Sequence, residues 1–159
     1  MQELNTAKAD QLVEDLEDIS SEASVVVFCV FRHDLDAVHV SAEKAKRDVF
    51  EVSGRANELE EWRKSKGAVL AIQVQAGSEG IDLTIANHAI YYSLPALSLY
   101  EQSRARLYRP NQTRPVSFIH YIARGTIDEL IYDSLTRKRS LIEDIQNGVV
   151  DFSSLNYGR

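Results

Sequence analysis

The sequence predicts an α/β fold, a three-layer domain in which a mostly parallel sheet is flanked by helices. Three observations favour this fold. Short apolar, β-branched runs such as residues 25–31, VVVFCVF, are typical of strands buried on both faces. Segments with apolar residues three or four positions apart, typical of helices, separate these runs. The chain has 159 residues, 44% of them hydrophobic, which suits one domain with a buried core.

The first half of the chain begins with an amphipathic helix in which Leu12, Leu16 and Ile19 share one face. The elements expected up to residue 64 are helix 8–19, strand 24–31, helix 34–46, strand 48–52 and helix 57–64. Asn57 is expected to cap the last of these helices, because Glu60 follows three positions later in the pattern of a capping box.

The second half continues the alternation of strands and helices. Its expected elements are strand 68–74, a loop over 75–83, strand 86–92, helix 98–108, strand 116–123 and helix 126–147. Thr126 and Glu129 fit a capping box for the last helix, and Gly148 follows as its stop. Of the neighbours Tyr91 and Tyr92, we expect one side chain in the core and the other toward a cleft.

Composition excludes several classes of protein. No run of eighteen apolar residues is present, so we expect no transmembrane helix and no membrane partner. Cys29 is the only cysteine and lies in an apolar run, which excludes disulfides, predicts an inert core thiol and favours the cytoplasm. The histidines show no metal-ligand spacing. We expect one domain over residues 1–151, a C-terminal tail over 152–159, and a longer parent protein.

A positive cluster stands out in an otherwise acidic chain, whose formal net charge is −6. Residues 101–115 carry four arginines and one glutamate. Arg106 and Arg109 are three positions apart, the spacing of residues on one helical face. Two guanidinium groups aimed together suit a triphosphate, on which negative charge develops during phosphoryl transfer. The alternative is an ordinary surface helix whose arginines lie in solvent or pair with Glu101.

A second candidate is the loop over residues 75–83, QAGSEGIDL. Gly80 lets the backbone approach a ligand closely, and Asp82 supplies a carboxylate that could accept a ribose hydroxyl. Gln75 and Ser78 could hydrogen-bond to phosphate oxygens. The alternative is a common turn of an α/β protein. Both this loop and the arginine helix follow strands, so we expect both at the carboxyl edge of the sheet, where such folds bind ligands.

The order of these segments resembles the C-terminal RecA-like lobe of superfamily-two helicases, most closely the Swi/Snf-type DNA translocases. The likeness rests on five segments that together cover most of the chain: VVVFCVF, Val52-Ser53-Gly54, residues 71–93, residues 100–116, and residues 123–145 with their GTIDEL start. A RecA-like fold is therefore expected. The compact length suggests a bacterial or phage version.

The resemblance implies roles for individual residues. Arg106 and Arg109 match two arginines that contact the γ-phosphate of ATP across the interface between two lobes, and they are the catalytic residues that it implies. Gln102 matches a glutamine that organises the ATP cleft. Gly80 and Asp82 match ATP-binding positions near the ribose.

The resemblance also implies partners. Ser53, Gly54 and Gln75 match regions that touch the DNA backbone, although Gln75 departs from the usual Thr, Ser or Lys. The chain has no G-x-x-x-x-G-K-[ST] phosphate loop. ATP and Mg²⁺ are therefore expected in the complete two-lobe enzyme, held mainly by an N-terminal RecA-like ATPase lobe, and not tightly by this domain alone. The isolated domain is expected to be inactive, and DNA, duplex rather than single-stranded, is the second expected partner.

Two other functions fit parts of the sequence. A non-catalytic module of the same fold, binding nucleic acid or a protein partner, would explain the acidic N-terminal half and the missing phosphate loop. The pair Arg106 and Arg109 argues against it, since a binding module has no need of that geometry. An unrelated α/β nucleotide-binding enzyme fits least, because neither G-x-G-x-x-G nor a nucleophile set is present.

Overall fold

A single parallel sheet of five strands organises the chain in the computed structural model, which describes residues 2–77, 80–107 and 115–146. In sheet order the strands are β2 (Val49–Val52), β3 (Val69–Gln73), β1 (Val25–Cys29), β4 (His88–Tyr91) and β5 (Ser117–His120). Every neighbouring pair is parallel. The strands predicted from apolar runs are thus confirmed, and the carboxyl ends of all five lie at one edge.

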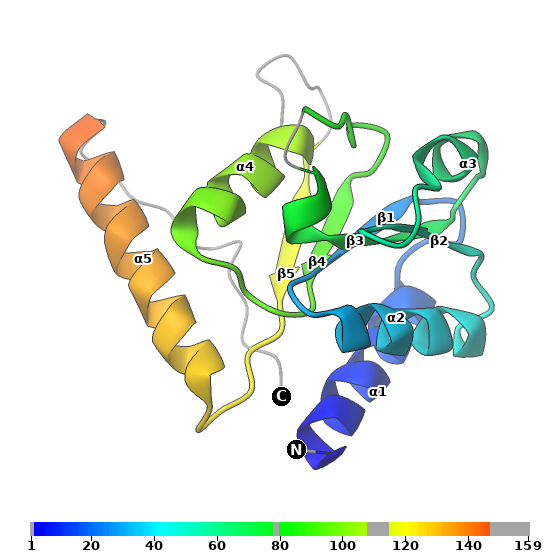
Figure 1. Cartoon of the computed structure of the whole chain (residues 1–159), viewed down its shortest axis with the longest axis horizontal. Coiled ribbons are helices and arrows are strands. Elements are labelled where there is room, and N and C mark those ends of the chain that lie inside the picture. The colour runs from blue at the N-terminus through cyan, green and yellow to red at the C-terminus, as the bar shows by residue number, and fades with distance from the viewer. Residues whose placement is uncertain (1, 78–79, 108–114, 147–159) are drawn as a thin grey trace.

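Helices cover both faces of this sheet (Figure 1). The helical elements are α1 (Gln2–Asp18), α2 (Arg32–Lys44), α3 (Leu59–Lys64), the 3₁₀ turn η1 (Val74–Gly77), α4 (Leu97–Leu107) and α5 (Ile127–Gln146). Side chains of α1 and α2 share one core, whereas α3, α4 and α5 share the other. The predicted three-layer α/β architecture is therefore confirmed.

Strand β1 shows why the sequence is apolar at consecutive positions. Val26 and Phe28 enter the core under α3, α4 and α5, and Val25, Val27 and Cys29 enter the core under α1 and α2. All five side chains are fully buried. A central strand of a parallel sheet has no solvent face, so alternation of apolar and polar residues is absent.

One tyrosine was placed wrongly by the sequence prediction. Tyr91 and Tyr92 are both buried, on opposite faces of the sheet, and neither faces a cleft. The physical reason is again the two-sided core, since consecutive residues at the end of β4 both find apolar neighbours. Tyr92 packs edge-on against Tyr121, and Tyr91 stacks on Phe28 with ring centroids 4.8 Å apart.

Helix starts differ in part from the predicted caps. Asn57 does not cap α3, because it forms an isolated antiparallel bridge with Val52, and Glu58 is the N-cap instead. At α5, the hydroxyl of Thr126 accepts a hydrogen bond from the N–H of Asp128 at 3.2 Å, so Thr126 does cap this helix. The carboxylate of Asp128, rather than that of Glu129, completes the arrangement by accepting from the N–H of Ala123 and from Lys8 on α1.

The turn between α1 and β1 is held by one buried cation. The guanidinium of Arg47 uses all five of its N–H groups, and each donates to a different backbone carbonyl. The acceptors are Leu16, Ile19, Ser20, Ala23 and Gly67, at 2.6–3.1 Å. Burial lowers the pKa of Arg47, which still leaves the group charged. No local pattern indicates this role, because Arg47 stands in a charged segment that resembles a solvated surface.

Candidate nucleotide and nucleic-acid interface

The predicted site residues fall into two places on the fold. Ser53 and Gly54 follow β2, and Gln75 lies in η1 directly after β3, so these three are at the carboxyl edge as expected. Gly80 and Asp82 lie on the chain that returns toward β4, and Gln102 and Arg106 lie on α4. Gly80, Asp82, Gln75, Gln102 and Gly54 are all exposed.

Arg106 is not at the carboxyl edge, contrary to the sequence-based expectation. Helix α4 runs back along the sheet, and Figure 1 shows its last turn near the starts of β4 and β5. There the N–H of Leu83 donates to the carbonyl of Arg106 at 3.1 Å. The loop containing Gly80 and Asp82 therefore lies against the end of α4. The structure brings these two predicted segments together, but beside the helix end rather than at the strand ends.

The Arg106 side chain is buried, at 6% exposure, although it carries a positive charge. Desolvation lowers its pKa, and the nearby Tyr91 opposes that shift. Within the part of the chain that the structure describes, no carboxylate forms an ion pair with it. Burying a charge is costly unless it is paired, so an anion that reached this guanidinium would offset part of that cost.

A buried cluster of polar aromatic contacts holds α4 in place. The hydroxyl groups of Tyr91 on β4 and Ser103 on α4 are hydrogen-bonded, and Ser103 also donates to the carbonyl of Tyr100 at 2.7 Å. The hydroxyl of Tyr100 is 2.8 Å from Nε2 of His120 on β5, whose ring stacks on Tyr91. These contacts fix both the rotation and the depth of α4, and hence the position of Arg106, one turn beyond Ser103.

The loop over Gly80 to Thr84 is shaped by its own polar groups. Gly80 has φ +71°, a conformation that L side chains rarely adopt, and no neighbouring atom would meet an added Cβ. Oδ1 of Asp82 accepts from the N–H of Thr84 at 2.9 Å and from its hydroxyl at 2.6 Å. Arg63 on α3 donates to the carbonyl of Asp82 at 2.7 Å. The carboxylate thus has a structural role here, and its contact with a ribose stays a prediction.

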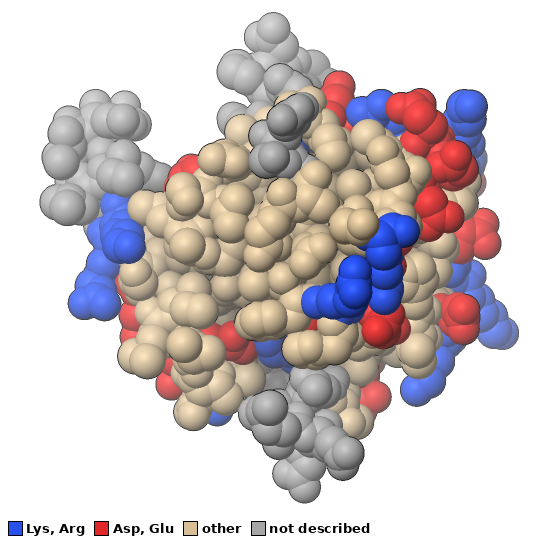
Figure 2. All heavy atoms as spheres, viewed as in Figure 1, with Lys and Arg blue, Asp and Glu red and all other residues tan. Residues whose placement is uncertain are grey.

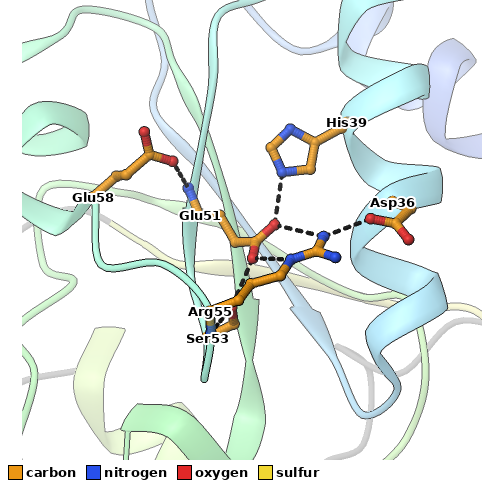
Figure 3. A network of polar contacts seen from close by, with 6 residues as sticks. All are labelled: Asp36, His39, Glu51, Ser53, Arg55 and Glu58. Atoms are coloured by element: carbon orange, nitrogen blue, oxygen red, sulfur yellow. Dashed lines mark hydrogen bonds and ion pairs between the residues drawn. The ribbon is translucent and has the colours of Figure 1, made fainter.

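The turn after β2, residues 53–57, is built on a buried carboxylate that the sequence analysis missed. Glu51 is 3% exposed, and Figure 3 shows its carboxylate at the centre of a polar network. It accepts from Nε2 of His39 at 2.8 Å, from the Ser53 hydroxyl at 2.6 Å, and from Nε and Nη2 of Arg55 at 2.8 and 3.1 Å. Nη2 of Arg55 also donates to Asp36 on α2 at 2.5 Å.

This network holds the pKa of Glu51 at about 2, below its usual value of 4.5, chiefly because Arg55 hydrogen-bonds to the ionised form. Desolvation opposes the shift, and Ser53 and His39 add to it. An ionised carboxylate only accepts hydrogen bonds, so Nε2 of His39 carries a proton. One sequence signal could have revealed part of this arrangement, namely a glutamate inside a buried strand with an arginine four positions later.

Some predicted groups lie outside the described residues. Arg109 and Ser78 are among them, so the expected alignment of Arg106 with Arg109 is not described. Among the described residues, no group of histidine, cysteine and carboxylate side chains could hold a metal ion. None of the helices described has both the length and the apolar composition needed to span a bilayer.

Comparisons with known proteins identify the family. The model for the helicase conserved C-terminal domain matches residues 7–111. DNA repair protein RAD5 of Yarrowia lipolytica is 29% identical over 132 residues, covering 78% of this chain and 13% of that protein. Transcriptional regulator ATRX of Mus musculus is 37% identical over 87 residues, covering 54% of this chain and 4% of that protein.

A solved structure supports the fold. The C-terminal part of the Fun30 ATPase domain superposes with a TM-score of 0.71 at 20% identity, covering 92% of this chain and 47% of that one. The likeness extends over most of the described sheet and its helices, as expected for a RecA-like α/β lobe. The chain spans only a small part of the length of the curated relatives that it matches. It belongs to the helicase conserved C-terminal domain family, with relatives among the Swi/Snf-type helicases.

Proposed function

We propose that this chain is the second motor lobe of a DNA-dependent ATPase, which supplies arginine to ATP bound by a separate N-terminal RecA-like lobe. The observation that carries the proposal is Arg106, a buried guanidinium at the end of α4 with no described carboxylate in ion-pair contact. Its neighbours Gly80 and Asp82 belong to the loop that hydrogen-bonds to the carbonyl of the same residue through Leu83.

The chemistry of the donor set fits a triphosphate. When the two lobes close, the Arg106 guanidinium would donate to the γ-phosphoryl oxygens, on which negative charge develops in the transition state. Because the Tyr91–Ser103 contact and the surrounding core fix α4, the guanidinium needs little reorganisation as that charge forms. Arg109 and Gln102 are proposed to complete the contact with the nucleotide.

ATP with its Mg²⁺ is proposed to bind mainly to the partner lobe. There ATP would supply the transferred phosphoryl group, and Mg²⁺ would neutralise part of the negative charge on the phosphates. The absence of a phosphate loop in the whole sequence supports this division. The residues of this lobe then bind and orient the γ-phosphate, and Asp82 and Gly80 line the approach to the ribose. Closing and opening of the two lobes would couple turnover to movement along DNA.

Nucleic acid is proposed to contact the strand ends rather than the end of α4. Ser53–Gly54 and Gln75 follow neighbouring strands of the sheet, β2 and β3, so they present one continuous edge. Figure 2 shows a broad uncharged area in the middle of the view, a group of basic side chains to its right, and acidic and basic side chains intermixed at the upper right, near α3. The chain as a whole is acidic, with a formal net charge of −6, so the lobe alone should bind DNA weakly.

The test is DNA-stimulated ATP hydrolysis by the intact protein that contains both lobes, comparing wild type with Arg106→Ala. We expect turnover to fall by about a thousandfold, as for other arginines that contact a transferred phosphoryl group, with ATP binding retained. Arg106→Lys should rescue little of it, because an ammonium lacks the forked donors of arginine.

Arg104→Ala is the matched control, since Arg104 lies on the same helix but its guanidinium stacks over the ring of Phe118 at 4.6 Å. This variant should keep turnover within about threefold once its folding is verified by thermal unfolding. Turnover of Arg106→Ala close to that of wild type would reject the proposal. DNA binding without any ATP turnover in wild type would favour the non-catalytic binding module instead.

A further inference from the structure

The hydroxyl of Ser53 is already committed inside the protein. It donates to Oε2 of Glu51 at 2.6 Å and accepts from the N–H of Arg55 at 3.1 Å. The N–H of Ser53 is used as well, by the carbonyl of Ala56 at 2.8 Å. A side chain held in this way cannot donate to a phosphate without breaking the network. The contact predicted for Ser53 must therefore pass to another group in the same turn.

Gly54 offers that group. It is exposed, and an added Cβ would meet no atom within 4 Å. Among the hydrogen bonds of the described residues, none uses its N–H. Arg55 follows, with Nε and Nη2 turned inward and Nη1 bonded to no described residue. The exposed turn thus leaves one backbone N–H and one guanidinium amine without a partner among the described residues, and such donors suit a phosphate.

Glu51 determines which groups face outward. Its two oxygens accept four hydrogen bonds, which is the full capacity of an ionised carboxylate. In Figure 3 the donors converge on it from the turn and from α2, so the carboxylate joins the end of β2 to α2. The backbone supports this closure, since the N–H of Glu58 donates to the carbonyl of Glu51 at 2.8 Å.

We propose that Glu51 is a positioning residue for nucleic-acid binding, which turns the Ser53 hydroxyl inward and presents the Gly54 N–H and Arg55 to a backbone phosphate. The inference deepens the proposed function and rests on its nucleic-acid contact. Glutamine cannot replace Glu51, because only the oxygen of its amide accepts hydrogen bonds. The NH2 group would face Arg55 or Ser53, which are themselves donors in this network. The carboxylate itself is buried and makes no contact with the ligand.

A charge-matched pair of variants separates positioning from simple electrostatics. Glu51→Gln and Asp36→Asn each remove one negative charge beside Arg55, but Asp36 is exposed and does not contact Ser53. If only charge mattered, both variants would bind DNA more tightly. Positioning instead predicts weaker binding for Glu51→Gln alone, by about fivefold to tenfold, as for the net loss of one ordinary hydrogen bond.

Gly54→Ala is the variant that does not depend on the stability of the network. Its φ is not in the positive region and its Cβ has open space, so folding should be unaffected. A methyl group at this position would nevertheless obstruct a phosphate that approaches the N–H. We expect binding weakened by about the same factor, with an unchanged temperature of unfolding.

The experiment measures the Kd of a fluorescent DNA duplex for the intact protein by anisotropy, at several salt concentrations, with thermal unfolding of each variant recorded in parallel. We expect Glu51→Gln and Gly54→Ala to bind the duplex more weakly than wild type. The Kd of Asp36→Asn should be within about twofold of wild type, with an unchanged salt slope. The inference would be overturned if Glu51→Gln bound more tightly than wild type, or if Glu51→Gln and Asp36→Asn had equal effects. It would also be overturned if Gly54→Ala left binding unchanged, or if wild type did not bind the duplex. The motor proposal is decided separately, by turnover of Arg106→Ala, so the two failures are distinguishable.

Discussion

Replacement of Arg47 by methionine tests how far one side chain stabilises the amino-terminal layer. Methionine retains the unbranched apolar stem and removes all five donors. The carbonyls of Leu16, Ile19 and Ser20 belong to the end of α1 and the residues after it, where backbone acceptors have no helical partner. Ala23 and Gly67 add two acceptors from the turns before β1 and β3.

The magnitude follows from these contacts. Hydrogen bonds from a charged donor contribute about 1.5–3 kcal/mol each, but five bonds to one group are not additive. A cavity of about 510 Å³ beside Arg47 admits water, which can satisfy part of the carbonyls after the substitution. We therefore expect a loss of about 3–5 kcal/mol in the free energy of unfolding. At about 3 °C per kcal/mol for a domain of this size, the unfolding temperature should fall by roughly 9–15 °C.

Urea unfolding at neutral pH, followed by far-UV circular dichroism, measures this loss directly. Lys44→Met is the control, because Lys44 is an exposed cation at the end of α2, close before Arg47 in the chain, and its effect should be within about 0.5 kcal/mol. Arg47→Lys should be intermediate, since an ammonium has three donors. A loss below about 1 kcal/mol for Arg47→Met would show that water replaces the guanidinium, and the reasoning would then be wrong.

Two further predictions concern ionisable groups, Glu51 at the end of β2 and Cys29 in the core under α1 and α2. Because the folded pKa of Glu51 is about 2, below 4.5, its stabilisation is fully present above pH 4.5 and is lost as pH falls toward 2. Glu51→Gln should therefore cost up to about 3 kcal/mol at pH 7 and less at pH 3 in urea titrations, and an equal cost at both would contradict the network. Burial raises the pKa of the Cys29 thiol, so iodoacetamide at pH 8 should alkylate it only as fast as the protein unfolds. Mass spectrometry follows the alkylation, and rapid labelling of the folded protein would contradict the burial of Cys29.

The order of strands and helices could be predicted because each element carries its own periodicity. Residues 25–31 form a continuous apolar run, and only a strand covered on both faces needs one. The 3₁₀ turn η1 was not predicted, because Val74 continues the apolar run of β3 and the sequence does not show where the strand ends. The end of α1 was predicted to within one residue, but the contact of Leu16 with Arg47, 31 residues later, was not, because no local pattern encodes it.

The candidate site could be predicted in its parts but not in its arrangement. Spacing placed Arg106 on a helix, yet its burial depends on contacts of α4 with β4 and β5 that no local pattern encodes. Glu51, Arg55 and Asp36 are ordinary charged residues in the sequence, and they become a network only when α2 packs beside β2. Tertiary proximity of polar groups therefore had to come from the structure.

Helix α3 links the two halves of the site. It begins directly after the turn that Glu51 organises, and Arg63 near its end donates to the carbonyl of Asp82. Leu83, the next residue, donates to the carbonyl of Arg106. Since α3 has only six residues and Trp62 anchors it in the core, a shift of the turn after β2 would displace the helix as a unit rather than bend it. The structure thus offers a continuous series of contacts from the proposed phosphate-binding turn to the backbone of the proposed catalytic arginine.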